Sequence, residues 1–501
     1  MRMQPVHMIG MTAIGASLRR VSGSHVRSTL FRRASGAAAL TVSICALSLW
    51  LAGCGAPDLE KTGLVKISNR VYAFIAPGPT AAEGLGANSG FVVGDEGVLV
   101  VDSRYTPALA RELVDAIRSV TDAPIRYLVN THYHPDHTWG NSVFKEEGAV
   151  IISHPRTRAD IEKYSPLYLE HYRTYRGEAY EQLKDVTIVL PDTTFEDELS
   201  IDLGGVEVVI RHFGPGHTAG DCIVTVPGDR VVFTGGLAAE GYHLNLGDVG
   251  GDFDNWAATL LRLGGMDFRY VVPAQGMVSD AALLETCRTY IETLRDRCRD
   301  EIRAGNYLNV VALTMKIPGT EGYLQENLLP FNVRAVYRRE IMKVLEPNFK
   351  IDLPDGFEID DGGAEGRGGR IKWVWNSDNG KLEIEVHWSP AGRNELLVQD
   401  VKDRVIRYTE ANKGTLSMET AGTKTLEIGG VHEPAAFGTY RIRSGTTLMG
   451  SGIWTWSMLT RGGTLYAIQL QTDANRVEER ERRNMEILER IAGTFRLTAG
   501  G

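Results

Sequence analysis

The chain has 501 residues and is acidic, with 63 aspartates and glutamates against 54 lysines and arginines. Its length suffices for roughly two or three domains with sizeable cores. The hydrophobic content of 43% and the charged content of 23% are ordinary for a soluble globular protein. The net charge of −9 becomes −15 when the six arginines of residues 1–53 are removed with that segment. Such an acidic surface argues against a protein that holds nucleic acid or anionic lipid through its surface field.

Residues 1–53 differ from the rest of the chain. They contain six arginines and no acidic residue, and an apolar run over 37–51 precedes Ala52-Gly53-Cys54. This pattern is typical of a secretory signal peptide, because a spanning helix needs about 20 apolar residues. Leu51-Ala52-Gly53-Cys54 resembles the bacterial lipoprotein cleavage box, although a cut elsewhere would leave Cys54 incidental. The resemblance implies an exported lipoprotein of the cell envelope, anchored in the membrane at Cys54 and facing the periplasm, with residues 54–63 as a tether.

Short strands and one helix are expected between residues 64 and 120. Alternation of apolar and polar residues predicts strands over 65–67, 71–75 and 91–93. Apolar residues at helical spacing then predict a helix over 106–120 that packs on a sheet.

A histidine cluster follows the next predicted strand. Residues 125–129 read as a short buried strand, and the stretch 130–141 then places three of the 12 histidines within six residues. His132 and His134 are two apart, so extended backbone sends both to the same side. Pro135 ends the strand, and the turn can bring Asp136 and His137 back toward the same point. Converging nitrogen and oxygen donors suit a borderline cation such as zinc, whereas polar loop residues at a sheet edge are the alternative.

The stretch Asn130–Asn141 resembles the signature of the metallo-β-lactamase superfamily. Phe213–Asp221 is similar to the second metal block of that family, and Asn88–Asp102 is similar to its first hairpin. The resemblance covers roughly residues 64–300. It implies an α+β fold over residues 64–348, an αββα sandwich of two sheets packed face to face with helices outside, and a zinc site at one edge.

The resemblance also implies roles for individual residues. The metal ligands would be His132, His134, His217, Asp136 and His137, with Asp136 also catalytic, while Asp102 and Thr218 would support the ligands from behind. Tyr242 and His243 lie in a following loop and are candidates for substrate contact, with ordinary ordered-loop residues as the alternative.

Two departures from the family pattern concern the second metal. Gly236 stands where the family usually has the aspartate that bridges two metals, and Gln275 stands where it usually has a last histidine. A neutral amide oxygen is a weaker zinc donor than imidazole, so Gln275 is at most a weak ligand. We therefore expect one firmly bound zinc, with the second weak or absent.

Three imidazoles on one zinc with an open fourth position form a catalytic arrangement. Zinc lowers the pKa of bound water to about 7, so the pattern implies a hydrolase whose metal-bound hydroxide attacks an ester, thioester, lactone or amide carbonyl of a small-molecule substrate. A β-lactam hydrolase and a non-catalytic zinc-binding envelope lipoprotein are the alternatives.

The C-terminal part carries no cluster of metal-binding residues. A glycine-rich stretch predicts a flexible linker over 349–369, and residues 370–501 read as a smaller α+β domain of unknown role. Within it we expect a strand at 382–388, a helix at 394–412, further strands near 425–428, 437–444, 452–458 and 464–471, and a charged helix at 473–491. This domain is a candidate surface for a protein partner.

Overall fold

The computed structural model describes most of the chain. The described residues are 63–77, 86–175, 181, 183–248, 250–347, 349–365, 368–377, 380–390, 416–428, 430–444, 447–461, 464–473 and 478–498. The predicted signal peptide, Cys54 and the helix expected at 394–412 lie outside these residues.

The first sheet contains seven strands in chain order. Strands β1 to β4 pair antiparallel, and β4 to β7 pair parallel. The strands are β1 (Gly63–Lys66), β2 (Val71–Ile75), β3 (Ser89–Val93), β4 (Val98–Val101), β5 (Ile125–Val129), β6 (Val150–Ser153) and β7 (Thr193–Thr194). Because β4 and β5 are parallel, their carboxyl ends meet at one edge, where the histidine cluster begins.

A second sheet of five strands packs against the first. Its order is β12-β11-β10-β9-β8, formed by β8 (Glu198–Asp202), β9 (Glu207–Arg211), β10 (Ile223–Val226), β11 (Val231–Phe233) and β12 (Tyr270–Val272). Buried side chains from both sheets form one apolar cluster that includes Val92, Leu99, Val208 and Val224. Two sheets with a shared core confirm the expected sandwich.

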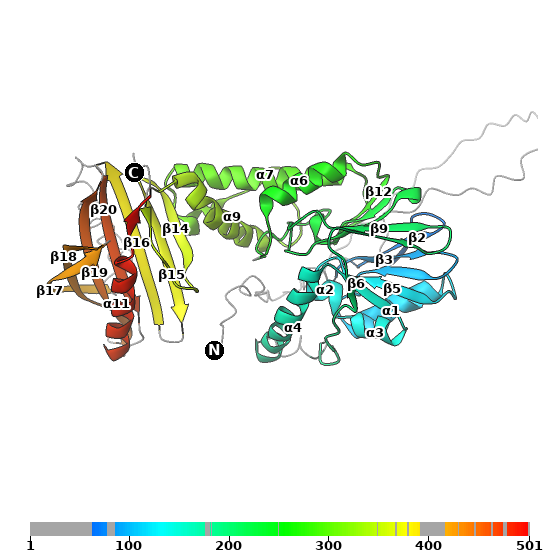
Figure 1. Cartoon of the computed structure of the whole chain (residues 1–501), viewed down its shortest axis with the longest axis horizontal. Coiled ribbons are helices and arrows are strands. Elements are labelled where there is room, and N and C mark those ends of the chain that lie inside the picture. Colours follow the sequence, from blue (N-terminus) through cyan, green and yellow to red (C-terminus); the bar gives the residue numbers. More distant parts are fainter. Residues whose placement is uncertain are drawn as a thin grey trace, which may run out of the picture.

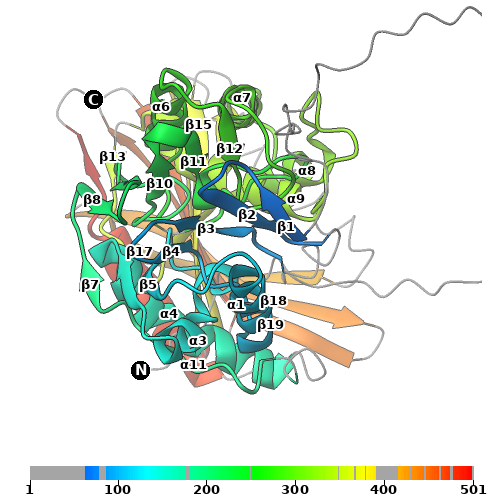
Figure 2. The same ribbon diagram turned by 90° about the vertical axis from the view of Figure 1, so that its right-hand side faces the viewer.

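Helices cover both outer faces of the sandwich (Figure 2). The first sheet is covered by α1 (Pro107–Arg118) and α3 (Asn141–Glu146), which bury Leu113, Ile117 and Phe144 in a common cluster. Helix α1 begins where Thr106 accepts a hydrogen bond from the Leu109 amide, and it buries the apolar positions that predicted it. The described residues of this part also form α2 (Pro135–Thr138), α4 (Pro155–Tyr175) and α6 (Phe253–Gly264), with short 3-10 turns η2 (Pro227–Asp229) and η3 (Gly235–Leu237).

A helical arm joins the sandwich to the C-terminal part (Figure 1). It consists of α7 (Ala282–Arg303), α8 (Leu308–Thr314) and α9 (Leu328–Leu345). One apolar cluster runs from Trp256 of α6 through Ile291 and Val336 of the arm to Tyr466 and Phe495 near the C-terminus. The sandwich and the C-terminal sheet therefore share a continuous core.

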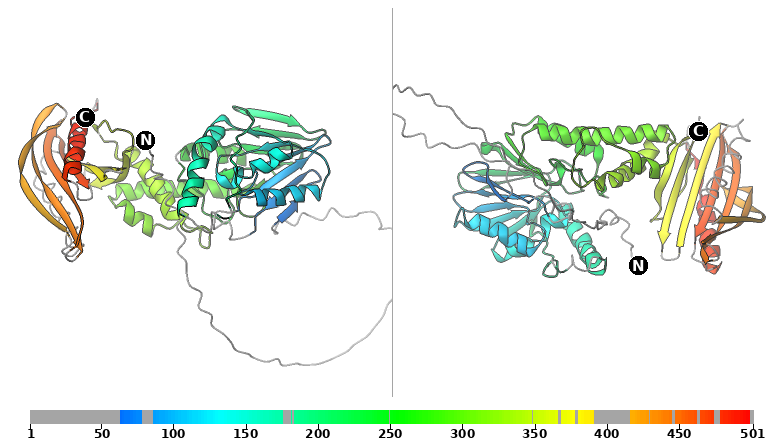
Figure 3. Two further views of the ribbon diagram at one scale, coloured as in Figure 1. Left: turned by 90° about the horizontal axis from the view of Figure 1, so that it is seen from below. Right: turned by 180° about the vertical axis from the view of Figure 1, so that it is seen from behind.

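Within the described residues, the C-terminal part contains a seven-stranded antiparallel sheet. A helix near the C-terminus lies against this sheet (Figure 3). The strand order of the sheet is β14-β15-β16-β20-β19-β18-β17, and α11 (Glu478–Ala492) contacts β20, β16, β17 and β19. The strands are β14 (Glu358–Glu365), β15 (Gly368–Ser377), β16 (Gly380–Pro390), β17 (Leu416–Ile428), β18 (Val431–Ser444), β19 (Thr447–Arg461) and β20 (Thr464–Asp473). A final strand β21 (Arg496–Leu497) returns to pair with β13 (Phe349–Lys350).

The prediction of a flexible linker over 349–369 is wrong for most of this range. Strands β13 and β14 lie within it, and β14 pairs with β15 from Glu358 to Glu365. The glycine-rich composition suggested a free connection, but pairing with β15 supplies the backbone hydrogen bonds of this strand. Tyr337 of α9 adds a further hydrogen bond by donating to the Gly362 carbonyl at 2.9 Å.

Three cysteines fall within the described residues, and each is buried with a free thiol: Cys222, Cys287 and Cys298. Among the described helices, none combines the length and apolar character that a membrane crossing requires.

Candidate metal centre

The histidine cluster lies in the turn that follows β5. His134 keeps extended backbone, with φ −61° and ψ 149°, as Pro135 demands, and the His137 amide then donates back to the His134 carbonyl at 3.1 Å. The Asn130 and Asn141 side-chain amides exchange two hydrogen bonds of 2.9 and 3.0 Å, which close the two ends of this segment. The local sequence therefore fixes the turn that presents the imidazoles.

His132, His134 and His217 come together from two distant segments. One ligand nitrogen from each lies within 4.8 Å of the other two. His217 Nε2 and His134 Nδ1 are 2.9 Å apart. The three-histidine group predicted from the sequence thus exists as a cluster that can hold a metal ion.

The second ring nitrogen of each histidine is already occupied. His132 Nδ1 lies 3.1 Å from Thr131 Oγ1, and His217 Nδ1 lies 2.9 Å from the Asn245 carbonyl. His134 Nε2 lies 3.3 Å from a carboxylate oxygen of Asp248. These contacts leave His132 Nε2, His134 Nδ1 and His217 Nε2 for a common ion, and such outer partners fix the orientation of metal-binding imidazoles.

Burial keeps two of these imidazoles neutral, as ligands must be. Burial and the neighbouring His134 lower the pKa of His217 to about 3. Burial, together with His137, His134 and His217 nearby, lowers the pKa of His132 well below its usual value. For Asp248, burial raises the pKa, but the hydrogen bond and charge of His134 outweigh it and bring the pKa to about 2.

The sequence model of the metallo-beta-lactamase superfamily matches residues 82–275, the segment that contains all three histidines. Residues 82–275 are a metallo-beta-lactamase superfamily domain.

The curated relatives are distant. A type 2 metallo-beta-lactamase from Bacteroides fragilis is 20% identical over 230 residues, which cover 45% of this chain and 84% of that protein. A linear primary-alkylsulfatase from Pseudomonas sp. (strain ATCC 19151) is 24% identical over 283 residues, covering 48% of this chain and 53% of the relative, so the match spans about half the length of that enzyme. A solved metallo-beta-lactamase from Pontibacter korlensis aligns with a TM-score of 0.39 at 22% identity, over 46% of this chain and 99% of that one.

Asp102 contacts several residues next to the histidines of the metallo-beta-lactamase domain. It directly follows β4, has a positive φ of 61°, and accepts hydrogen bonds of 2.8 Å from the Thr131 amide and hydroxyl. It also contacts His137 Nδ1 at 2.8 Å. Thr218, in contrast, donates through its amide and hydroxyl to Asp221 at 2.7 and 2.8 Å, so its contacts brace the turn after His217.

Asp136, His137 and Gln275 form a second group beside the first. Asp136 Oδ2 lies 3.7 Å from His137 Nε2, and Gln275 Nε2 donates to the same oxygen at 3.5 Å. The His137 ring lies 4.1 Å from the His132 ring, centroid to centroid. Gln275 thus directs its amide nitrogen, which has no lone pair for a metal, toward Asp136.

Gly236 allows no side chain at the position of the usual bridging aspartate. A Cβ there would lie 2.2 Å from His217 Cδ2. The glycine therefore permits the close approach of the backbone to a histidine of the cluster, and an aspartate would collide with that ring.

Tyr242 and His243 are buried, and they contact segments that follow them in the chain. His243 Nδ1 lies 3.0 Å from the Tyr290 hydroxyl on α7, and the Tyr242 backbone pairs with Leu324. The role of these two residues in substrate contact stays a prediction.

Sequence reasoning missed Asp248, Asn245 and Tyr133. The Tyr133 hydroxyl donates to Asp248 at 2.5 Å, so a phenol and a carboxylate together back His134. Asp248 and Asn245 lie in a loop without periodicity or a metal-binding pattern, and no local signal could have identified them. Tyr133 lies between His132 and His134, and this position in the motif was the one sequence feature that could have indicated its role.

Proposed function

We propose that this protein is a metal-dependent hydrolase that uses a single firmly held zinc ion. The observation that carries the proposal is the convergence of His132 Nε2, His134 Nδ1 and His217 Nε2, whose other nitrogens are all engaged. Three imidazoles with a vacancy for a fourth ligand are typical of catalytic zinc sites. When bound, the ion would act as a Lewis acid that polarises the substrate and makes water acidic.

Asp136 carries the carboxylate that we expect to act as the general base of this site. Its carboxylate is partly exposed, at 21% for the side chain, and one of its oxygens lies 3.5 Å from Gln275 Nε2 and 3.7 Å from His137 Nε2. A carboxylate in this position can orient a water molecule toward a substrate carbonyl and accept its proton. Asp102 holds His137, and His137 in turn limits the positions open to Asp136.

The same geometry supports one metal ion in preference to two. The second group retains Asp136 and His137, but Gly236 supplies no bridge and the Gln275 amide donates to Asp136. The Gln275 amide nitrogen thus faces the carboxylate of Asp136, which a second cation would need as a ligand. We expect one zinc per chain after exhaustive dialysis, measured by metal analysis of the purified protein.

The substrate class requires a direct test. The purified full chain, stripped and reloaded with zinc, would be assayed against an ester, a thioester, a lactone, a chromogenic β-lactam and, because one relative is an alkylsulfatase, an alkyl sulfate. We expect metal-dependent turnover of a carbonyl substrate. His134→Ala should lose both zinc and activity, and Asp136→Ala should keep zinc but lose roughly 100-fold or more in kcat, the usual contribution of a general base.

Asp267→Ala is the matched control, since that carboxylate is exposed and pairs only with Arg230 among the described residues. Turnover that survives both site variants would contradict the proposal. Zinc binding without turnover of any of these compounds would favour a non-catalytic zinc-binding protein, and turnover of the β-lactam alone would favour a β-lactam hydrolase.

The cellular setting is part of the proposal. We infer from Leu51-Ala52-Gly53-Cys54 that the mature chain is a lipoprotein of the bacterial envelope. Metabolic labelling with a radioactive fatty acid should mark the wild type and leave the Cys54→Ser variant unlabelled.

A further inference from the structure

Helix α9 lies outside the segment that matches the metallo-beta-lactamase superfamily, yet it contacts the loop behind the histidine cluster. The loop comprises residues 244–252, apart from residue 249, and we call it the backing loop. It supplies the Asn245 carbonyl to His217 and the Asp248 carboxylate to His134. Two of the three imidazoles therefore depend on where this loop lies.

Asn332 of α9 binds the first half of the backing loop. Its side chain is fully buried, accepts a hydrogen bond from the Leu246 amide at 2.8 Å and donates to the Leu244 carbonyl at 2.5 Å. These two bonds enclose Asn245, whose carbonyl faces His217. The amide side chain thus fixes the backbone on both sides of that carbonyl.

Arg339 of α9 binds the second half of the loop. Its guanidinium donates to the Asp248 carbonyl at 2.5 Å and to the Gly251 carbonyl at 2.8 Å, and it stacks over the Phe253 ring at 4.6 Å. Asn332 and Arg339 are seven residues apart, so two helical turns present them on the same face.

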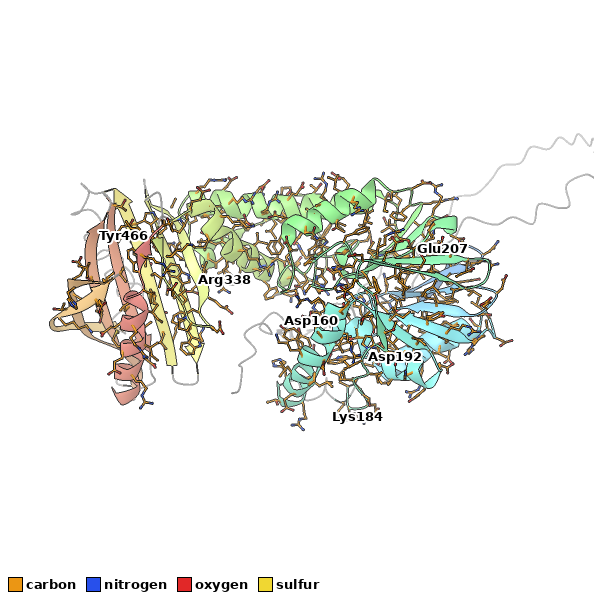
Figure 4. All side chains as sticks on the ribbon, in the orientation of Figure 1. Asp160, Lys184, Asp192, Glu207, Arg338 and Tyr466 are labelled. Atoms are coloured by element: carbon orange, nitrogen blue, oxygen red, sulfur yellow. The ribbon has the colours of Figure 1, made fainter. Side chains whose placement is uncertain are left out.

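The packing between α9 and the loop leaves little freedom. A Cβ at Gly247 would lie 1.7 Å from the Phe331 ring, so the loop backbone lies directly against α9. Helix α9 is held in turn by the C-terminal sheet, through the hydrogen bond from Tyr337 to the Gly362 carbonyl and through an ion pair of 3.7 Å between Arg338 and Asp360. Figure 4 shows Arg338 on α9 beside this sheet.

We propose that Asn332 and Arg339 are positioning residues for the metal centre, which set the orientation of His217 and His134 through the backing loop. This inference rests on the proposed function, because it assigns the two residues a role in holding the same metal ion. The metal centre would then depend on α9 and on the C-terminal sheet that supports it, both of which lie outside the segment that matches the superfamily.

The test uses Co²⁺ titrated into the metal-free full chain, followed by the visible absorption of the bound ion. We expect Asn332→Ala and Arg339→Ala to bind Co²⁺ about tenfold more weakly than the wild type, with an altered absorption band, since partners behind metal ligands typically contribute 10- to 100-fold in affinity. Hydrogen–deuterium exchange should also become faster across the backing loop. Arg334→Ala is the matched control, because it removes another arginine of α9, whose side chain donates to the Pro330 carbonyl of the same helix, and leaves the loop contacts intact.

Arg339→Lys guards against a variant that fails to fold. It keeps the positive charge and can retain only part of the two-carbonyl contact, so we expect an affinity between those of the wild type and Arg339→Ala. Wild-type affinity and absorption in the folded Asn332 and Arg339 variants would overturn the inference even if the protein is a hydrolase. A wild type that binds Co²⁺ but hydrolyses nothing would overturn the hydrolase function alone, and one that binds no Co²⁺ would overturn both.

Discussion

At the scale of single residues, the orientation of each imidazole is set by the group that contacts its second ring nitrogen. Thr131, Asp248 and the Asn245 carbonyl each engage one ring nitrogen and leave the other for the common site. The partners differ in charge, and only His134 is backed by a carboxylate. A carboxylate behind an imidazole raises its basicity as a ligand, so His134 should be the strongest donor of the three.

Gly236 gives the sharpest prediction at this scale. Any side chain there would push the His217 ring, so Gly236→Ala should weaken zinc binding by roughly tenfold or more, and Gly236→Asp should weaken it without adding a second ion. Competition with a chromophoric chelator measures the affinity, and metal analysis gives the count. Gly228→Ala is the control, because a Cβ at that position meets open space. Two firmly bound ions in Gly236→Asp would contradict this account.

At the scale of elements, α4 shows how a buried histidine limits stability in acid. His154 precedes the helix, its Nδ1 accepts a hydrogen bond from the Arg156 amide at 3.2 Å, and its ring stacks on His212 at 3.9 Å. Burial, His212 and Arg156 lower the pKa of His154 to about 4. Protonation would remove the acceptor and place a positive charge at a helix N-terminus, which is unfavourable.

The sign of the pH effect follows from that pKa. The unfolded chain binds the proton near pH 6.5 and the folded chain near pH 4, so stability should fall as the pH decreases between these values. We expect a loss of roughly 1–2 kcal/mol from this residue. His154→Asn retains an acceptor favoured at helix starts and cannot titrate, so its unfolding free energy should vary less over this range. Urea denaturation at several pH values measures the unfolding free energies. If the unfolding free energy of His154→Asn depended on pH as steeply as that of the wild type, His154 would not be the cause of the acid sensitivity.

At the scale of the whole molecule, the apolar cluster that crosses the helical arm joins the sandwich to the C-terminal sheet. The buried face of α9 contributes Val333, Val336 and Ile341 to this cluster, and Tyr337 bonds to β14. Because this core is continuous, the two parts should not unfold independently.

The prediction is a single calorimetric transition for the full chain. Ile341→Ala should lower the unfolding free energy by roughly 2–5 kcal/mol, as for other large-to-small core substitutions, and should shift the whole transition. Met342→Ala, at a neighbouring position that is 41% exposed, should have a much smaller effect. Two separate transitions, only one of which moves in Ile341→Ala, would show that the parts are independent.

Much of the fold could be predicted because it follows from local patterns. The β5 strand, the turn enforced by Pro135 and helix α1 depend on neighbours in sequence, so they appeared close to their expected places. The strand at β14 was missed because its stability comes from pairing with β15 and from contact with α9, which its glycine-rich composition does not reveal.

The sequence by itself determined the metal-binding chemistry, since histidines two apart before a proline, with His217 in a second block, define the ligands by type and spacing. Only the tertiary structure decided which nitrogen of each ligand faces the site, because Asn245 and Asp248 reach the rings from a loop far along the chain. It also decided that α9 supports that loop, through Asn332 and Arg339. Contacts between distant segments depend on how the whole core packs, and no short stretch of sequence encodes them.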